Sequence, residues 1–389
     1  MIVGIDASNV RVGGGLTHLV EILRVAEPET IGFSKVILWA GHESLRIVDD
    51  RSWMDKSHQP MLDKPLLHRI LWQRFTLGRL ARLSNCDVLF VPGGSYAGDF
   101  EPIVTMSQNM LPFDKRELRR YACSYTSLRL NALRWTQSHT FRKAAGLIFL
   151  TRYAREIVMR EIEAGTAETT IIPHGVGTRF ICSPRKQLPI SYYSTQRPFR
   201  ILYVSIIDMY KHQWTVVEAV SRLRKHGIPV TLDLVGPSYP RALLRLQRTL
   251  ARIDPSGKFA MYSGSVPHVE LPARYAQADL CLFASSCENM PNILLEGMAS
   301  GLPIACSDRG PMPEVLGTSG VYFDPENPED IAHALQSMID SPDLRMQLAE
   351  DSFRRAQAFS WQQCANETFG FLARIATAQP GKSVATGQV

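Results

Sequence analysis

Two glutamates, Glu288 and Glu296, are separated by seven residues and could bind a ligand rich in hydroxyl groups. The apolar run 279–284 just before them predicts a buried parallel strand, and two serines begin the loop at its carboxyl end. Glu288 is therefore expected in a strand-to-helix loop, where its carboxylate is free to act on a ligand. The alternative is that it is an ordinary solvated loop residue.

The second glutamate is predicted to lie inside a helix. Pro291 fits the first turn of that helix and Gly301 fits its end. The neighbours of Glu296 are small or apolar, so its ionised carboxylate needs hydrogen-bond donors. The vicinal hydroxyls of a ribose would meet that need, and a neighbouring backbone amide is the structural alternative.

The elements that must position these carboxylates belong to a chain of 389 residues, which suits two domains of under two hundred residues each. The first strand, Ile2 to Asp6, has no export signal before it, and no apolar stretch reaches the roughly 18 to 20 residues that cross a bilayer. These features predict a cytoplasmic protein. Seven dispersed cysteines predict free thiols and no structural zinc, with Cys281 and Cys306 as small core residues on strands.

Positive charge is concentrated in the first half of the chain. Residues 1–195 hold 25 Lys and Arg against 18 Asp and Glu, whereas the remainder holds 18 against 19. Between Lys64 and Arg155 there are 15 basic and 5 acidic residues, interleaved with aromatics. This pattern suits contact with an anionic membrane surface, although helix surfaces with aromatic residues in the core would give the same composition. Nucleic acid is a third partner class, and we expect none because no recognition motif accompanies the charge.

Strands and helices alternate along both halves, which predicts an α/β protein with two doubly wound parallel sheets. The strands expected in the first half are 2–6, 35–39, 87–91, 102–106, 146–150 and 170–172, and its helices include 16–25, 66–83, 115–143 and 154–163. The strands expected in the second half are 200–205, 230–235, 259–262, 280–284, 303–307 and 321–323.

We expect a first domain at 1–180, a linker at 177–198 and a second domain at 198–358, with a disordered tail at 377–389. Helices are expected at 330–340, 343–358 and 361–375, and the last of them could join the first domain. Open sheets bind ligands at the carboxyl ends of their strands, so the predicted site is the cleft where the two sheets face each other.

Three features of the first half could bind an anion or a sugar. Gly13 and Gly14 stand in a glycine-rich turn before a helix, where backbone N–H groups and the helix dipole favour an anion, although a tight connection needs the same glycines. Gln108 and Asn109 follow a strand and offer two amides for sugar hydroxyls, or an Asn-capped turn. His174 lies in a turn, where histidines are more often structural than catalytic.

The second half has a matching set of polar and glycine residues at strand ends. Lys211 comes near a helix start, where a cation opposes the helix dipole unless a bound diphosphate reverses the penalty. The turn 262–267, which contains Gly264 and Val266, could present backbone groups to a nucleobase or be a simple turn.

Together these motifs make the stretch 200–324 resemble the retaining glycosyltransferases of family 4, which have the GT-B fold. The matching pieces are Leu-Tyr-Val through Tyr-Lys-His, Leu-Val-Gly-Pro, Tyr-Ser-Gly-Ser-Val, the segments around Glu288 and Glu296, and Gly-Pro-Met-Pro-Glu-Val. Pro-His-Gly-Val, the glycine-rich turn and Phe-Ser-Trp at 359–361 extend the match more loosely.

The resemblance implies roles for these residues. Glu288 would contact the transferred hexose as the catalytic residue, Glu296 the ribose, and Lys211 the diphosphate. It also implies a base-binding loop with Gly264 and Val266, and donor contacts from Asn289 and Met290. Gly13, Gly14, Gln108, Asn109 and His174 would lie at the phosphates or the acceptor. No cofactor or metal is expected, because lysine and backbone N–H groups take the charge of the leaving diphosphate.

Three departures from the family pattern stand out. Ile206 replaces an arginine that would contact phosphate, Pro291 interrupts a loop that is usually glycine-rich, and Gln108-Asn109 replace a His-Asp pair. The sequence therefore predicts a cytoplasmic, possibly peripheral, hexosyltransferase that uses a UDP- or GDP-sugar and a lipid-linked saccharide acceptor in bacterial surface polysaccharide synthesis. The competing hypotheses are a catalytically silent scaffold subunit and a sugar-nucleotide epimerase of the same fold.

Overall fold

The computed structural model describes residues 1–11, 13–162, 165 and 167–378. It divides into two compact units. Unit 1 contains residues 1–113, 124–175 and the segment from Trp361 onward, and unit 2 contains 114–123 and 176–360. Most of the predicted tail, 379–389, lies outside the described residues.

Unit 1 is built on a seven-stranded parallel sheet. Its order is β3-β2-β1-β4-β5-β6-β7, so chain direction across the sheet reverses between β1 and β4. Four central strands are buried almost completely, as expected for a sheet covered on both faces. The strands are β1 Ile2–Asp6, β2 Lys35–Ala40, β3 Met54–His58, β4 Val88–Val91, β5 Ile103–Met106, β6 Gly146–Phe149 and β7 Glu168–Ile171.

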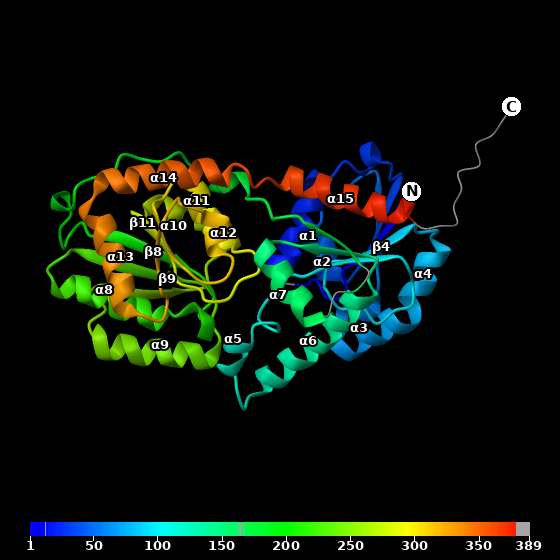
Figure 1. Ribbon diagram of the computed structural model, residues 1–389, viewed down its shortest axis with the longest axis horizontal. Coiled ribbons are helices and arrows are strands. Elements are labelled where there is room, and N and C mark those ends of the chain that lie inside the picture. The colour runs from blue at the N-terminus through cyan, green and yellow to red at the C-terminus, as the bar shows by residue number, and fades with distance from the viewer. Residues whose placement is uncertain (12, 163–164, 166, 379–389) are drawn as a thin grey trace. The chain divides into compact units, whose positions relative to one another are not determined.

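Helices cover this sheet, and one of them comes from the end of the chain. Helix α15 packs on α1, β4 and β6 (Figure 1), and a Cβ on Gly146 would meet the Phe371 ring at 2.8 Å. The helices of unit 1 are α1 Gly14–Val25, α2 His42–Ile47, α3 Leu66–Trp72, α4 Gly78–Leu83, α6 Tyr125–Lys143, α7 Arg152–Ile162 and α15 Trp361–Thr377, with short 3₁₀ turns at Pro28–Ile31 and Pro60–Asp63.

Unit 2 repeats the same strand arrangement in six strands. Its order is β10-β9-β8-β11-β12-β13, and its switch point lies between β8 and β11. The strands are β8 Phe199–Val204, β9 Val230–Val235, β10 Ala260–Gly264, β11 Leu280–Phe283, β12 Ile304–Ser307 and β13 Val321–Phe323. Cys281 and Cys306 are buried neighbours on β11 and β12, which confirms their predicted place in the core.

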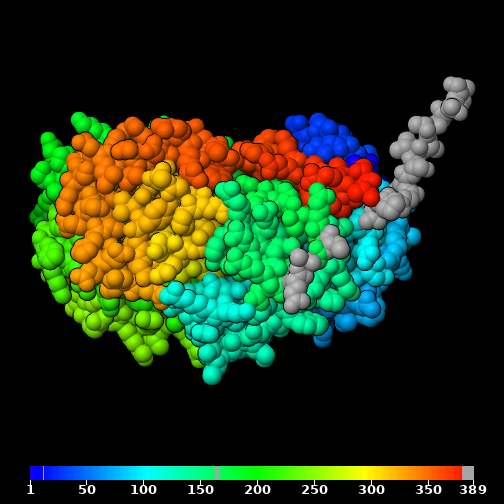
Figure 2. Space-filling view, viewed as in Figure 1, coloured from blue at the N-terminus to red at the C-terminus, as the bar shows by residue number. Residues whose placement is uncertain are grey.

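Layers of helices cover the second sheet as well. Helix α13 packs on α8, and α14 packs on α11. In Figure 2 the orange surface of the region that contains α13 and α14 lies beside the yellow surface of the region that contains α11. The helices are α5 Lys115–Arg119, α8 Gln213–Lys225, α9 Pro240–Ile253, α10 Leu271–Gln277, α11 Asn292–Ala299, α12 Met312–Leu316, α13 Pro328–Asp340 and α14 Pro342–Ala356, with 3₁₀ turns η4 Thr178–Phe180, η5 Ile190–Tyr192, η6 Met209–Lys211 and η7 His268–Glu270.

Each strand predicted in either half is present to within two residues, which confirms the doubly wound architecture. The prediction missed β3, whose sequence Met-Asp-Lys-Ser-His lacks an apolar run. This strand pairs only with β2 at the edge of the sheet, and an edge strand tolerates polar side chains.

The prediction of one long helix at 115–143 was wrong. Cys123 adopts φ +57°, which ends any right-handed helix, and Ser124 then caps α6 by accepting a hydrogen bond from the Ser127 amide at 3.2 Å. The first piece, α5, belongs to unit 2 although the residues before and after it belong to unit 1.

The helix expected at 66–83 is present over that whole range, with a π-helical segment inside it. The π-helical segment Gln73–Leu77 lies between α3 and α4, and it turns the Gln73 side chain into the buried end of β1. Gln73 donates a hydrogen bond there to the Ser8 hydroxyl at 2.9 Å and another to the Asp6 carboxylate. Such π-bulges occur frequently at functional sites.

The segment expected as a linker, 177–198, packs along unit 2. The buried Arg345 of α14 holds it by donating hydrogen bonds to the Gln187 side chain and the Leu188 carbonyl. Phe180 lies against Tyr275, with ring centroids 5.9 Å apart.

Candidate functional site

Lys211 and Glu288 meet at the switch point of the second sheet. Lys211 ends η6, which follows β8, and Glu288 lies in the loop after β11. Because β8 and β11 are neighbouring parallel strands, their carboxyl ends meet, and the Lys211 Nζ donates to the Glu288 carboxylate. Open α/β sheets bind their ligands at this place.

The lysine side chain of this pair is almost fully buried, at 6% exposed. Its ammonium group lies 5.1 Å from the ring centre of Tyr210 and 5.2 Å from that of Phe283. The Tyr203 hydroxyl fixes the backbone by donating to the Lys211 carbonyl at 2.8 Å. Burial of a charge costs several kcal/mol in desolvation. The Lys211 ammonium therefore needs an anionic partner at this position.

The loops that hold these two residues are tied to each other. The Ser286 amide donates to the Tyr210 carbonyl at 2.9 Å, and the Ser286 hydroxyl lies 2.9 Å from the His212 ring nitrogen Nε2. His212 adopts φ +52°, a left-handed conformation that directs α8 away from the loop. Burial, then the charge of Arg120, lowers the pKa of His212 to about 4, so the imidazole is neutral near pH 7.

Glu296 lies inside α11 and is buried, as the sequence predicted. Helix α11 begins at Asn292, and Pro291 is its N-cap rather than part of its first turn. The carboxylate accepts a hydrogen bond from the Tyr275 hydroxyl at 3.2 Å and lies 3.1 Å from the His268 Nε2. The hydrogen-bond partners of the Glu296 carboxylate are thus side chains from distant parts of the sequence. They are not the neighbouring backbone amide that was the structural alternative.

Tyr275 and His268 were missed by the sequence analysis. Neither has a motif around it, and only the packing of α10 and η7 brings them to α11. Burial, then the charge of Glu296, raises the pKa of Tyr275 well above its usual value, so its hydroxyl stays a donor.

The turn after β10 reaches the same region. Gly264 has φ +73°, its carbonyl accepts a hydrogen bond from the Gly236 amide at 2.8 Å, and half-buried Val266 follows it. His268 is two residues beyond Val266, so this turn and Glu296 are parts of one site. Asn289 and Met290 are buried beside Glu288 in the sequence.

In unit 1 the structure brings two of the predicted groups together. Gly13 has φ +72° and precedes α1, with Gly13 and Gly14 exposed. A Cβ on Gly15 would lie 2.6 Å from the Gln108 side-chain oxygen, so this amide touches the glycine-rich turn. The Asn109 side chain instead accepts a hydrogen bond from the Leu111 amide at 3.1 Å, which is the Asn-capped turn named as the alternative.

His174 is buried in a stack of rings. Its ring centre is 4.7 Å from that of His18 on α1 and 5.4 Å from that of Trp361 on α15. Burial, then the charge of His174, lowers the pKa of His18 well below its usual value. His174 thus connects α1 and the first turn of α15 at the end of the first sheet.

The aromatic residues among the basic helices divide into two groups. Trp72, Tyr121 and Phe141 are buried, as the structural alternative required. Phe75, Tyr125 and Trp135 are more than 70% exposed and lie on the π-helical segment and on α6 of unit 1. No helix in the described part of the chain is long and apolar enough to cross a membrane.

Comparisons with known proteins agree with this geometry. Residues 198–341 match the family model described as glycosyl transferases group 1. The O-antigen chain mannosyltransferase B of Escherichia coli is 36% identical to the chain over 108 residues, which are 28% of each protein. The second half of the chain is therefore similar to glycosyl transferases of group 1.

Solved structures show that the chain has the GT-B fold. Sucrose-phosphate synthase from Thermosynechococcus elongatus has a TM-score of 0.75 at 17% identity and is covered over 99% of its length by 97% of this chain. WaaG, a glycosyltransferase involved in lipopolysaccharide biosynthesis, has a TM-score of 0.68 at 15% identity, covering 96% of this chain and 99% of WaaG. The chain covers from 28% to 62% of the length of several curated relatives.

One departure from the family pattern that the sequence resembles is visible at the switch point of the second sheet. Ile206 is 37% exposed just after β8, so an apolar side chain occupies the position expected for a phosphate-binding arginine. Lys211 is a cation at this switch point, and its Nζ donates to the Glu288 carboxylate.

Proposed function

We propose that the chain is a retaining glycosyltransferase that moves a hexose from a UDP- or GDP-sugar to a saccharide acceptor. The observation that carries this proposal is the buried Lys211–Glu288 pair at the switch point, with Glu296 eight residues further along the same loop and helix. Three charges with restricted surroundings, all at the carboxyl ends of parallel strands, suit a ligand with phosphates at one end and hydroxyls at the other.

Lys211 would exchange its partner when the donor binds. Its ammonium group would move from Glu288 to the diphosphate, and Glu288 would then be free to accept hydrogen bonds from the hexose hydroxyls. The bond from the anomeric carbon to the phosphate oxygen breaks, and the acceptor oxygen forms the new bond on the same face. A donor phosphate oxygen takes the acceptor proton, and Lys211 with backbone N–H groups stabilises the leaving diphosphate without a metal.

Glu296 would bind the ribose. Its present donors, Tyr275 and His268, show that this buried carboxylate is hydrogen-bonded on both oxygens. His268 is 43% exposed, so it can be displaced by ribose hydroxyls while Tyr275 stays in place. The base would then lie on the turn with Gly264 and Val266, and Asn289 and Met290 would line the sugar.

Unit 1 would bind the acceptor. Gly13, Gly14 and Gln108 form one surface at the start of α1, which suits a phosphate or a sugar, with Asn109 and His174 on neighbouring loops. Because the relatives include an O-antigen mannosyltransferase and a lipopolysaccharide enzyme, we propose a lipid-linked saccharide of a bacterial surface polysaccharide as the acceptor.

A lipid-linked acceptor requires contact with a membrane from the cytoplasmic side. The exposed apolar side chains of α3, the π-helical segment and α6 would supply it, since Arg74 and Arg129 are exposed on the same segments and Arg79 is exposed on the adjoining α4. Gln73 and Thr136 both contact Ser95, which holds these segments close together.

We expect the membrane contact to depend on two exposed aromatic residues. The variant Phe75→Ser/Trp135→Ser should lose most of its flotation with vesicles of phosphatidylglycerol, because each exposed aromatic side chain contributes roughly 1.5 to 3 kcal/mol when it enters an apolar phase. Val269→Ser, an exposed apolar position in unit 2, is the matched control. Equal flotation of both variants and of the natural chain would show that these helices do not make the membrane contact.

Calorimetric titration with UDP, GDP, ADP and CDP tests the donor site. We expect one diphosphate to bind, with about tenfold weaker binding in Glu296→Gln because one charge-assisted hydrogen bond is lost. Glu350→Gln, an exposed position on α14, should bind as the natural chain does. Glu288→Gln should bind the diphosphate but transfer no sugar.

The competing functions give different results in the same experiments. A silent scaffold subunit, which the loss of arginine at position 206 favours, would bind none of the four diphosphates. An epimerase would bind the sugar nucleotide and convert it without any acceptor. Unchanged sugar transfer by Glu288→Gln would overturn the assigned role of this residue.

A further inference from the structure

Helix α5 belongs to unit 2, whereas the residues on either side of its segment belong to unit 1. The chain leaves unit 1 after Phe113, residues 114–123 pack within unit 2, and the chain returns to unit 1 at Ser124. Asp114 caps the helix by accepting hydrogen bonds from the amides of Arg116 and Glu117, both at 3.0 Å. So short a helix is not stable alone, which means that its contacts with unit 2 hold it.

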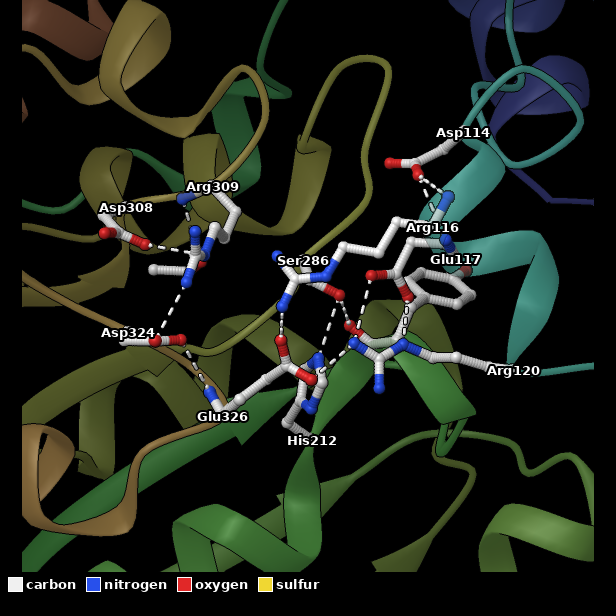
Figure 3. Close-up of polar contacts among 12 residues, drawn as sticks. Asp114, Arg116, Glu117, Arg120, His212, Ser286, Asp308, Arg309, Asp324 and Glu326 are labelled. Atoms are coloured by element: carbon white, nitrogen blue, oxygen red, sulfur yellow. Dashed lines mark hydrogen bonds and ion pairs between the residues drawn. The ribbon is translucent and has the colours of Figure 1, made fainter.

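Ion pairs form the first of these contacts (Figure 3). Arg120 donates to Glu117 at 2.6 Å and to Glu326 at 2.6 Å, and Arg116 donates to the other oxygen of Glu326. Glu117 is buried, and Glu326 lies in the loop between β13 and α13. Although burial opposes ionisation, the hydrogen bond from Arg120 lowers the pKa of Glu326.

Tyr121 forms the second contact and leads to the donor site. Its hydroxyl donates to the Asp208 carboxylate at 2.6 Å, and Asp208 caps η6 by accepting from the Met209 amide at 2.7 Å. The last residue of η6 is Lys211. The Tyr121 side chain is 2% exposed, and its acceptor Asp208 is half-buried.

The loop that carries Glu288 is held through the same turn. Ser286 donates its amide and its hydroxyl to the Tyr210 carbonyl, at 2.9 and 3.2 Å. Tyr210 lies between Asp208 and Lys211, so the order of contacts from α5 is Tyr121, Asp208, η6 and then Ser286. His212, which contacts Ser286, is drawn beside Glu326 and Arg120 in Figure 3.

We propose that Arg120 and Tyr121, which directly follow α5, are positioning residues for the donor site. Arg120 ties this segment to Glu326, and Tyr121 holds through Asp208 the turn that ends in Lys211. The inference rests on the proposed glycosyltransferase function. Neither residue needs to touch the donor. The segment follows Gln108-Asn109 after only a few residues, so an acceptor-binding loop of unit 1 and a clamp on the donor loops of unit 2 are one continuous piece of chain.

Helix α5 provides its own control for the test. Arg119, the last residue of α5, is exposed and makes no side-chain hydrogen bond or ion pair among the described residues, so Arg119→Gln removes the same charge one residue before Arg120→Gln does. Tyr121→Phe removes only the hydroxyl. We expect Tyr121→Phe and Arg120→Gln to raise the donor KM by about tenfold and to weaken UDP or GDP binding by a similar factor, as loss of one buried or charge-assisted hydrogen bond predicts. The melting temperature and the acceptor KM should change little, and Arg120→Lys should restore part of the binding.

A second measurement distinguishes failure of the clamp from failure of the proposed function. Hydrogen exchange of the amides at 208–212 and 286–289, without any ligand, should become faster in Tyr121→Phe and Arg120→Gln and stay unchanged in Arg119→Gln. If the natural chain binds no nucleotide but exchange responds in this way, the proposed function fails and the clamp stands. Exchange and donor KM that match those of Arg119→Gln would overturn the clamp.

Discussion

At the scale of single residues, the site depends on charges whose partners come from distant parts of the sequence. The sequence predicted Glu288, Glu296 and Lys211 because each follows a strand or lies in a helix with a readable pattern. It could not predict that Lys211 would pair with Glu288, or that Tyr275 and His268 would donate to Glu296. Those contacts depend on how loops and helices pack, and short-range periodicity carries no information about that.

His212 makes the stability of unit 2 sensitive to pH. Its pKa is about 4 in the folded protein and about 6.5 when unfolded, so the unfolded chain binds more protons between these values. Stability is therefore fully present above pH 6.5 and is lost as the pH falls toward 4. We expect a loss of about 2 kcal/mol between pH 7 and pH 5, measured by urea unfolding.

The variant His212→Asn should lack this contribution, because asparagine tolerates the left-handed conformation and does not titrate in this range. The exposed His226→Asn, on the C-cap of the same helix, should keep the pH dependence of the natural chain. His18 shifts in the same direction in unit 1, so the remaining slope in His212→Asn reports on that residue. An identical slope in all three proteins would contradict the assignment.

At the scale of elements, the strands were easier to predict than the turns that separate the helices. The buried strands were predictable because a continuous apolar run of four to six residues between turn signals is typical of a buried strand. The break at Cys123 was not, since no glycine or proline marks it. The two pieces 115–119 and 125–143 are both good helical sequence, and what separates them is the packing of Tyr121 and Leu118 in unit 2.

Gly236 is the turn residue that the Lys211 loop depends on. It follows β9 with φ +146°, and a Cβ there would lie 2.1 Å from the Ser205 carbonyl oxygen, just after β8. We expect Gly236→Ala to cost at least about 3 kcal/mol, because alanine adds a steric clash with backbone to an unfavourable φ. Gly227→Ala has φ +81° with open space around it, so it should cost only about 1 kcal/mol. Urea denaturation of the two variants, with diphosphate binding as a second readout, checks the difference.

At the scale of the whole molecule, the two doubly wound sheets and the return of the last helix to the first domain could be predicted, whereas the assignment of 114–123 to unit 2 could not. The return of the chain to unit 1 at Trp361 buries Trp361, Phe369, Phe371 and Leu372. Each such side chain contributes roughly 1.5 to 3 kcal/mol, so the four together approach the stability of an entire domain.

A chain that ends at Ser360 should therefore have a native unit 2 and an unfolded or aggregating unit 1. Limited proteolysis should degrade residues 1–113 and 124–175 while leaving 176–360 protected. A chain that ends at Ala378 keeps α15 and should resist digestion as the natural chain does. Protection of the first 113 residues in the shorter chain would show that α15 is dispensable.

The late return of α15 also bears on synthesis of the protein. A ribosome adds about 5 to 20 residues per second, so the roughly 200 residues between the end of the 124–175 segment and the end of α15 take on the order of 10 to 40 s. During that interval the faces of α1, β4 and β6 that α15 covers are without their partner. The nascent chain thus presents an apolar surface near its beginning until its last helix emerges, and that surface is where a chaperone would be expected to bind.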